Sequence, residues 1–162
     1  MNELEKKVLK YLTENARYTV SELSAMLGET DDKIKDAIKN LEDGGTIVKY
    51  TAIVNPEKED SDHVDALIEV KVRPQKLKGF DALAEELCAF KEVQSLYLMS
   101  GVFDLAVLIK GKNLTEIARF VSEKLSAVDG VISCATHFIL KKYKIEGQTT
   151  KSDEEEKRQL VL

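Results

Sequence analysis

The sequence has no long hydrophobic run, no excess of positive charge, and few residues of the kinds that bind metals or large anions. No stretch approaches the roughly 18 consecutive apolar residues of a membrane span, and the start MNELEKKVLK has no apolar signal core. We therefore expect a cytoplasmic protein. The net charge of −5 gives the chain no general attraction to nucleic acid or to an anionic membrane. Any contact with DNA must come from a local patch.

Cysteine and histidine are scarce, with two of each in the chain. Cys88 and Cys134 lie in different apolar segments without C-x-x-C spacing, so packed, reduced thiols are expected rather than a disulfide or a metal site. Neither His63 nor His137 stands at metal-ligand spacing from a second histidine, a cysteine or a carboxylate pair on one helix. We predict no metal site and no cofactor.

The first third of the chain is predicted to contain three helices. Apolar residues recur at helical spacing over about 2–15, and Thr19 and Glu22 have the spacing of a capping box that starts a second helix. Thr30 is the expected N-cap of a third helix, which ends at Gly44. The β-branched segment TIVKYTAIV then predicts a two-stranded wing. This order is typical of a winged helix-turn-helix, and a simple three-helix bundle is the alternative.

The third predicted helix is acidic for a helix that reads DNA, because its five carboxylates outnumber its three lysines. Acids in its first turn stabilise the helix N-terminus. Asp36 and Asp43 instead face outward and repel phosphates. We therefore expect weak binding by one copy of the domain and a need for several copies in one assembly. The residues left to contact DNA are Lys33, Lys35, Lys39 and Asn40, with Lys49 from the wing.

The rest of the chain is predicted to follow the order βαββαβ. The stretch NPEKEDSDH has a proline and no apolar residue, which indicates a linker. HVDALIEVKVRP alternates as a strand, VQSLYLMSG and VFDLAVLIKG are strands joined by a tight turn at Ser100 and Gly101, and DGVISCATHFILKKY is the last strand. One helix follows the first strand and another begins at Asn113. The buried face of this second helix is expected to hold Leu114, Ile117, Ala118, Val121 and Leu125.

The predicted fold class is α+β, with an N-terminal winged helix-turn-helix followed by a ferredoxin-like βαββαβ sandwich. We place the winged helix-turn-helix at residues 1–54, the linker at 55–62, the ferredoxin-like domain at 63–145 and a charged tail at 146–162. Helices on one side of the sheet leave its other face open, so we expect sheet-to-sheet dimerisation. Candidates for that open face are Leu67, Leu96, Leu98, Leu105 and Val107.

Gly101 and Asp104 are the sharpest candidate pair in the chain. In a structural reading, the glycine supplies a positive φ in a hairpin and the aspartate caps the turn or faces water. In a functional reading, backbone N–H groups beside Gly101 hold the carboxylate of an amino acid and Asp104 accepts its ammonium. The local sequence leaves both readings open.

Two stretches, AIKNLEDGGTIVKYTAIVNP and SGVFDLAVLIKG, resemble the end of the recognition helix and the G-x-x-D signature of the Lrp/AsnC ("feast/famine") transcriptional regulators. The resemblance covers residues 1 to about 145. It implies dimers that assemble into tetramers, octamers or larger, with an amino acid or similar small effector bound between C-terminal domains. It therefore favours the functional reading. The expected effector-binding residues are Met99, Ser100, Gly101, Val102, Phe103, Asp104 and, by the resemblance, Thr136.

Three classes of function remain open at this point. The first is a regulator that binds double-stranded DNA and whose assembly or DNA binding responds to a small effector. The second is an effector-binding oligomer that has lost DNA affinity, which the acidic outward face favours. The third is an enzyme, since haem-precursor decarboxylases share this two-domain plan. Such an enzyme needs histidine and arginine around an anionic macrocycle. The chain has only four arginines and two histidines, so we expect a regulator rather than an enzyme. Because the net charge is −5, we expect no membrane partner.

Overall fold

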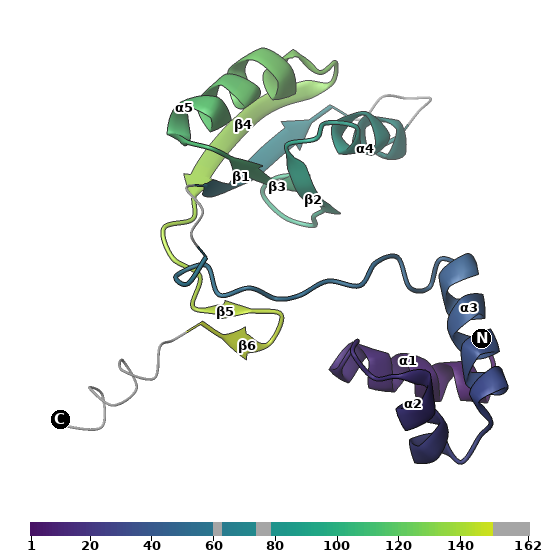
Figure 1. Cartoon of the computed structure of the whole chain (residues 1–162). Coiled ribbons are helices and arrows are strands. Elements are labelled where there is room, and N and C mark those ends of the chain that lie inside the picture. The colour runs from purple at the N-terminus through teal and green to yellow at the C-terminus, as the bar shows by residue number, and fades with distance from the viewer. Residues whose placement is uncertain (60–62, 74–78, 151–162) are drawn as a thin grey trace. The chain divides into compact units, whose positions relative to one another are not determined.

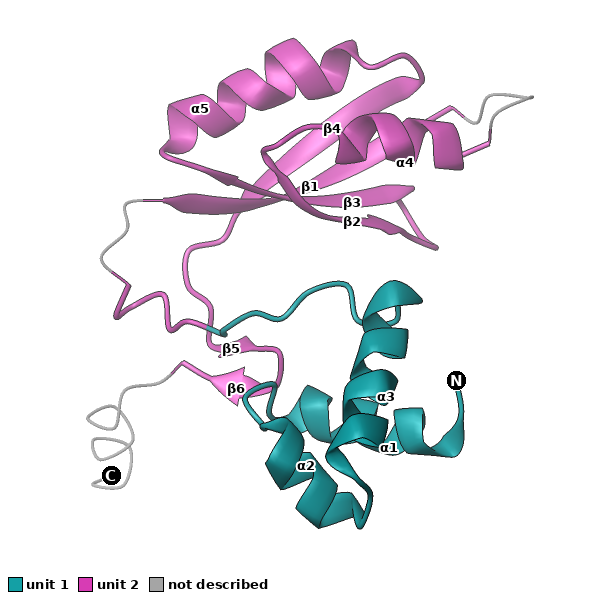
Figure 2. Cartoon of the chain, turned by 45° about the vertical axis from the view of Figure 1, so that its right-hand side comes forward, with its two compact units in different colours: residues 1–53 teal, residues 54–162 magenta. Residues whose placement is uncertain are grey.

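The computed structural model describes residues 1–59, 63–73 and 79–150, and the chain divides into two compact units, residues 1–53 and 54–162 (Figure 2). Each unit has its own hydrophobic core. The predicted linker at 55–62 begins in the second unit, and its residues 60–62 lie outside the described residues. Residues 151–162 of the predicted tail lie outside them as well. Among the helices of the described ranges, none combines the length and the hydropathy that a bilayer span requires.

The first unit consists of three helices, α1 (Glu3–Glu14), α2 (Val20–Leu27) and α3 (Asp31–Asp43) (Figure 1). The predicted capping box that starts α2 is present, with the Thr19 side chain accepting from the backbone N–H of Glu22. Gly28 ends α2 with a φ of 67°, a left-handed conformation that glycine adopts without a steric penalty. The helices meet through one apolar stripe each, and the buried core comprises Val8, Leu12, Leu23, Ile34, Ala37 and Leu41.

The predicted two-stranded wing is not formed, because residues 46–54 contain no strand. TIVKYTAIV has no glycine or asparagine at which the segment could fold back into a hairpin. Its start is instead held against α3. The backbone N–H of Ile47 donates to the carbonyl of Leu41 (2.9 Å), and the Tyr50 hydroxyl donates to the Glu42 carboxylate (3.0 Å).

The second unit is a four-stranded antiparallel sheet in the order β2-β3-β1-β4, with its helices over one face (Figures 1 and 2). This βαββαβ arrangement confirms the predicted fold class. The strands are β1 (Val64–Val72), β2 (Val93–Leu98), β3 (Leu105–Gly111) and β4 (Val131–Phe138). The helices are α4 (Asp81–Cys88) and α5 (Leu114–Arg119), and α5 continues as a π turn at Phe120–Lys124 and a 3-10 turn at Leu125–Ala127.

Strand pairing decides which side chains face the helices. Ile68 pairs with Val107, and Val70 pairs with Leu105, so these two residues of β3 lie on the buried, helix-covered face. Leu96 and Leu98 of β2 pair with Val107 and Leu105 and lie on the same side of the sheet. The prediction that these four leucine and valine residues belong to the open face is therefore wrong. Leu67, which pairs with Leu108, does lie on the open face. Because β3 reads LAVLI, without polar alternation, only its register against β1 separates the two faces.

The π turn changes the buried face of the second long helix. Ile117 and Leu125 are buried as predicted, but Leu114 and Ala118 are exposed. Phe120, which the helical pattern did not include, is 3% exposed and packs in the core. One extra residue in a helical turn rotates every later side chain, which a constant helical period cannot anticipate.

A small hairpin follows β4. The end of this hairpin lies in the range 146–162, which was predicted to be a charged tail. Strand β5 (Lys144–Ile145) pairs with β6 (Gln148–Thr149) through a turn at Glu146 and Gly147, both of which have positive φ angles. This is the geometry of a tight hairpin turn. Thr150 after it is buried, and its carbonyl accepts from the Asn55 side chain (3.1 Å). Residues 146–150 are therefore folded rather than part of the charged tail.

Candidate functional site

The first candidate site is the outward side of α3. Helices α2 and α3 are joined by the short segment 28–30, so α3 occupies the place of a recognition helix. Its N-cap residue, Thr30, makes no side-chain capping hydrogen bond. Four of the predicted DNA-binding residues lie on α3 and are exposed, as is the fifth, Lys49, in the segment after α3. The structure thus exposes all five residues, and contact with DNA stays a prediction.

Carboxylates of the same unit neutralise two of the three lysines on α3. The Nζ of Lys33 lies 2.7 Å from the Glu29 carboxylate, and the Nζ of Lys35 lies 3.4 Å from that of Asp32. Within the described part of the chain, Lys39 has no ion-pair partner and neither do Asp36 and Asp43. The outward side of α3 therefore offers DNA one unpaired lysine beside two unpaired carboxylates.

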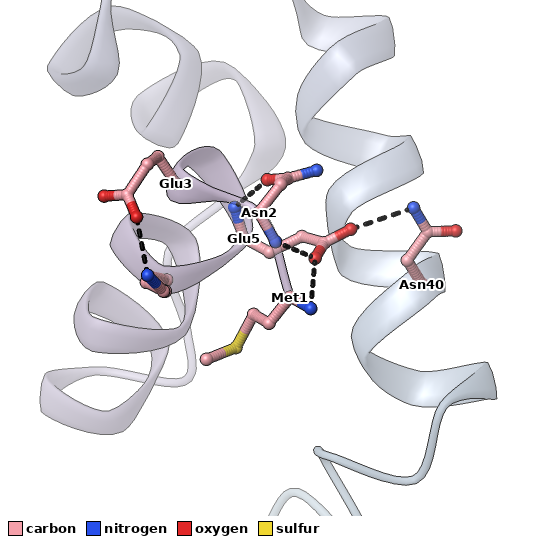
Figure 3. Close-up of polar contacts among 6 residues, drawn as sticks. Met1, Asn2, Glu3, Glu5 and Asn40 are labelled. Atoms are coloured by element: carbon pink, nitrogen blue, oxygen red, sulfur yellow. Dashed lines mark hydrogen bonds and ion pairs between the residues drawn. The ribbon is translucent and has the colours of Figure 1, made fainter.

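Asn40 is the predicted DNA-binding residue with the most specific contact inside the unit. Its side-chain nitrogen Nδ2 donates to Oε1 of Glu5 on α1 (3.1 Å), 35 positions away in the sequence (Figure 3). The other oxygen of Glu5 accepts from the backbone N–H of Asn2 (2.7 Å) and lies 3.8 Å from the nitrogen of Met1. Glu5 is 8% exposed, whereas Asn40 is exposed. A buried carboxylate thus holds an exposed amide of the recognition helix.

These contacts stabilise the charged form of Glu5. The hydrogen bond from the Asn2 backbone lowers the pKa of the Glu5 carboxyl most, the Asn40 amide lowers it further, and burial opposes both. Asn2 and Glu5 form a capping box at the start of α1. The spacing of Asn2 and Glu5 is that of a capping box, so the sequence alone was sufficient to predict this cap, although we did not predict it from the sequence. Nothing local in the sequence pointed from Glu5 to Asn40.

The second candidate site is the loop between β2 and β3. Residues 99–104 form a six-residue connection, so the predicted tight turn at Ser100 and Gly101 is wrong. The backbone N–H of Met99 donates to the carbonyl of Asp104 (2.8 Å), which closes the base of the loop. Ser100, Gly101 and Val102 at its tip are exposed, Val102 by 82%. Their backbone N–H groups make no hydrogen bond to another described residue, so these donors are not used within the described chain.

Asp104 stands at the base of this loop and contacts β1. Its backbone N–H donates to the carbonyl of Val70 (3.0 Å), and its carboxylate Oδ2 accepts from the backbone N–H of Val72 (2.9 Å). Val72 follows the register shift in the β1–β4 pairing, where a ladder hydrogen bond is interrupted. The other carboxylate oxygen has no partner in the described part of the chain. Asp104 is thus both a structural acceptor and a half-buried anion with one oxygen available.

The structure brings the six loop residues together but separates Thr136 from them. Thr136 lies on β4 opposite Ile68, and β1 runs between β4 and the loop. Apart from Gly101 itself and its two chain neighbours, no heavy atom of the described chain lies within 4 Å of the position a Cβ would take on Gly101, so the space beside that residue is open. Met99 is 42% exposed and Phe103 half-buried at the two ends of the loop tip.

The described residues outside these two sites hold further titratable groups, among them both cysteines and His137. Over residues 1–59, 63–73 and 79–150, no group of three or more His, Cys, Asp or Glu residues could hold a metal ion. Cys88 is exposed rather than packed, while Cys134 is half-buried and burial raises the pKa of its thiol. His137 pairs with Glu69 (3.4 Å), and their partners in β1 and β4 place both on the open face of the sheet.

Comparison with known proteins decides the family. The family model of the Lrp/AsnC ligand binding domain matches residues 65–149, and that of a winged helix-turn-helix DNA-binding domain matches residues 1–48. The chain belongs to the Lrp/AsnC family. It is a DNA-binding transcriptional regulator with a ligand-binding domain, and not an enzyme.

The relatives of this Lrp/AsnC regulator match nearly its whole length. It is 43% identical to the uncharacterized HTH-type transcriptional regulator YugG of Bacillus subtilis, over 99% of this chain and 98% of the relative. It is 31% identical to the uncharacterized HTH-type transcriptional regulator PH0140 of Pyrococcus horikoshii, over 86% and 85%. The structure of the transcriptional regulator NMB0573 of Neisseria meningitidis in complex with L-Met matches with a TM-score of 0.69 and 27% identity, over 91% of this chain and 96% of that one.

Proposed function

We propose that this regulator binds an amino acid at the loop 99–104 and that the amino acid changes its assembly or its DNA binding in the cytoplasm. The observation that carries the proposal is the position of Asp104, whose half-buried carboxylate has one oxygen held by Val72 and one oxygen without a partner in the described chain. The related Neisseria regulator was crystallised with L-Met. That relative supports an amino acid as the class of effector.

The loop offers the complement of both charged ends of an amino acid. The unused N–H groups of Gly101 and Val102 are donors suited to a carboxylate, and open space adjoins Gly101. The free oxygen of Asp104 is an acceptor suited to an ammonium, in a charge-assisted hydrogen bond. Met99, Ser100 and Phe103 then flank the side chain of the effector. Since β1 separates Thr136 from this loop, Thr136 contributes to such a site only from a second subunit.

The open face of the sheet supports a dimer as the unit of assembly. Leu67 and Leu108 are cross-strand neighbours on the face opposite the helices, with Tyr97 and Ala106 beside them. Tyr97 is 53% exposed in the single chain. An apolar sheet face without a helix layer is stabilised when a second copy covers it. We propose a homodimer through this face that assembles further into tetramers, octamers or larger.

Isothermal titration calorimetry with the full chain and a panel of amino acids tests the effector site. The matched variant is Asp104→Asn, since the amide oxygen still accepts from Val72 while the negative charge is lost. Wild type is expected to bind at least one amino acid. The variant should bind that amino acid about tenfold to a hundredfold more weakly, because a hydrogen bond to a charged group contributes about 1.5–3 kcal/mol. Equal binding by the folded variant contradicts a role for Asp104 in holding the ammonium.

A further inference from the structure

The side-chain amide of Asn40 takes its orientation from a partner outside its own helix. An asparagine amide can turn over and exchange its oxygen and nitrogen, and the choice depends on its hydrogen-bond partners. Figure 3 shows the amide nitrogen of Asn40 pointing toward Glu5 and its oxygen pointing away. Glu5 carries only acceptors when it is ionised, so the reverse orientation would set the amide oxygen against a carboxylate.

Glu5 is well suited to impose this orientation. Its side chain is nearly buried, and the Asn2 backbone fixes its second oxygen at 2.7 Å. The lowered pKa of Glu5 keeps the carboxylate charged, and therefore acceptor-only, at neutral pH. One N–H of the Asn40 amide is engaged by Glu5. Its oxygen and its second N–H have no partner in the described chain and remain for an outside ligand.

We propose that Glu5 is a positioning residue for DNA recognition, because it orients the Asn40 amide so that its oxygen and one N–H read an adenine from the recognition helix. An asparagine amide pairs with adenine through two hydrogen bonds, accepting from N6 and donating to N7. Asn40 lies on the same flank of α3 as Lys33, since seven residues make nearly two helical turns. The inference concerns the first unit and stands whether or not the loop 99–104 binds an effector.

The chain offers a matched control for Glu5 in its second capping box. Glu22 accepts from the backbone N–H and the hydroxyl of Thr19 at 2.7 and 2.8 Å, but among the described residues it makes no hydrogen bond or ion pair with α3. Glu5→Gln and Glu22→Gln therefore change the same type of cap in the same way. Only the change at Glu5 alters the partner of Asn40, because a glutamine can present either an oxygen or an N–H to that amide.

The experiment uses the full chain and a pool of DNA duplexes with a randomised core. Wild type first selects a preferred duplex from this pool. Discrimination is then measured as the Kd for a scrambled duplex divided by the Kd for the preferred duplex. We expect Glu5→Gln and Asn40→Ala each to lower this ratio by about tenfold. Glu22→Gln should leave it unchanged, and Glu5→Gln should have no further effect in the Asn40→Ala background. The loss should be confined to adenine positions, with the salt dependence of binding unchanged.

Several results would overturn the proposal. One is that folded Glu5→Gln or Asn40→Ala discriminates between the two duplexes as well as wild type does. Another is that Glu22→Gln loses as much discrimination as Glu5→Gln. A third is that wild type binds the two duplexes equally well. A loss of affinity that is equal for the preferred and the scrambled duplex in Asn40→Ala, at unchanged discrimination, would place that amide on a phosphate instead. Thermal unfolding of each variant shows whether a loss of discrimination follows a loss of the fold.

Discussion

The carboxylate of Asp104 accepts a hydrogen bond from the backbone N–H of Val72 at 2.9 Å, where the pairing of β1 with β4 shifts its register. The bond joins the loop that precedes β3 to the end of β1. Val72 is 5% exposed, so its N–H has little access to water if the carboxylate is removed. Asp104, a candidate for holding an effector, thus also stabilises the domain that carries the candidate effector site.

Removing this acceptor should destabilise the second unit. Asp104→Ala leaves a buried N–H without a partner, and we expect the free energy of unfolding to fall by about 1–3 kcal/mol. Asp104→Asn keeps an oxygen facing Val72 and should lose less than about half of that. Urea unfolding of both variants measures the difference. Equal stability of Asp104→Ala and wild type would mean that water or a backbone shift replaces the bond.

A charge on the open sheet face should separate the subunits of the proposed dimer. Leu108→Lys places an ammonium among Leu67, Tyr97 and Ala106, where burial in a dimer would strip it of water. We expect the variant to sediment as a folded monomer at micromolar concentrations. Leu114→Lys is the control, because Leu114 is 54% exposed on α5, in the helix layer on the opposite side of the sheet. A Leu108→Lys protein that assembles as wild type does would exclude this face as the interface.

The stability of the first unit should fall in acid partly through Glu5. Hydrogen bonds from Asn2 and Asn40 depress the pKa of Glu5 in the folded protein below its ordinary value of 4.5. The resulting stability is fully present above that ordinary pKa and is lost as the pH falls through the folded value. Thermal unfolding followed by helical circular dichroism, from about pH 6 down to about pH 3, should show a shallower decline for Glu5→Gln than for wild type. Parallel curves would show that Glu5 does not titrate with folding.

Removing unpaired acids from α3 should tighten DNA binding. Asp36 and Asp43 are exposed and have no ion-pair partner in the described chain, so they repel phosphates without stabilising a lysine. The double variant Asp36→Asn, Asp43→Asn should bind DNA of random sequence about three- to tenfold more tightly at about 50 mM salt. Glu86→Gln with Glu123→Gln is a control of equal charge change on exposed helices of the second unit. If both pairs tighten binding equally, only net charge matters and α3 does not face the DNA.

Local patterns predicted the helices of the first unit and the order of elements in the second. The alternation of Ala66, Ile68 and Val70 predicted the buried face of β1, and all three are fully buried. Thr19 and Glu22 predicted the start of α2 in the same way. These features depend on neighbours within a few residues, so a single sequence contains the information.

The errors fall where distant segments decide the outcome. Leu105 and Val107 face the helices because of their register against β1, and Phe120 enters the core because of a π turn. The contacts of Asp104 with Val72 and of Asn40 with Glu5 join residues 32 and 35 positions apart. No local period encodes such pairs, so the sequence pointed to Asp104 and Asn40 as candidates but not to their partners.

DNA binding measured with and without amino acids tests the regulatory account most directly. The full chain is titrated into fluorescent genomic fragments at low salt, alone and with each amino acid of the panel, with Asp104→Asn alongside. The account predicts that at least one amino acid changes the apparent Kd by about fivefold or more, the lower end of typical couplings between sites, and that Asp104→Asn loses this response. DNA binding and assembly size that no amino acid alters would contradict it.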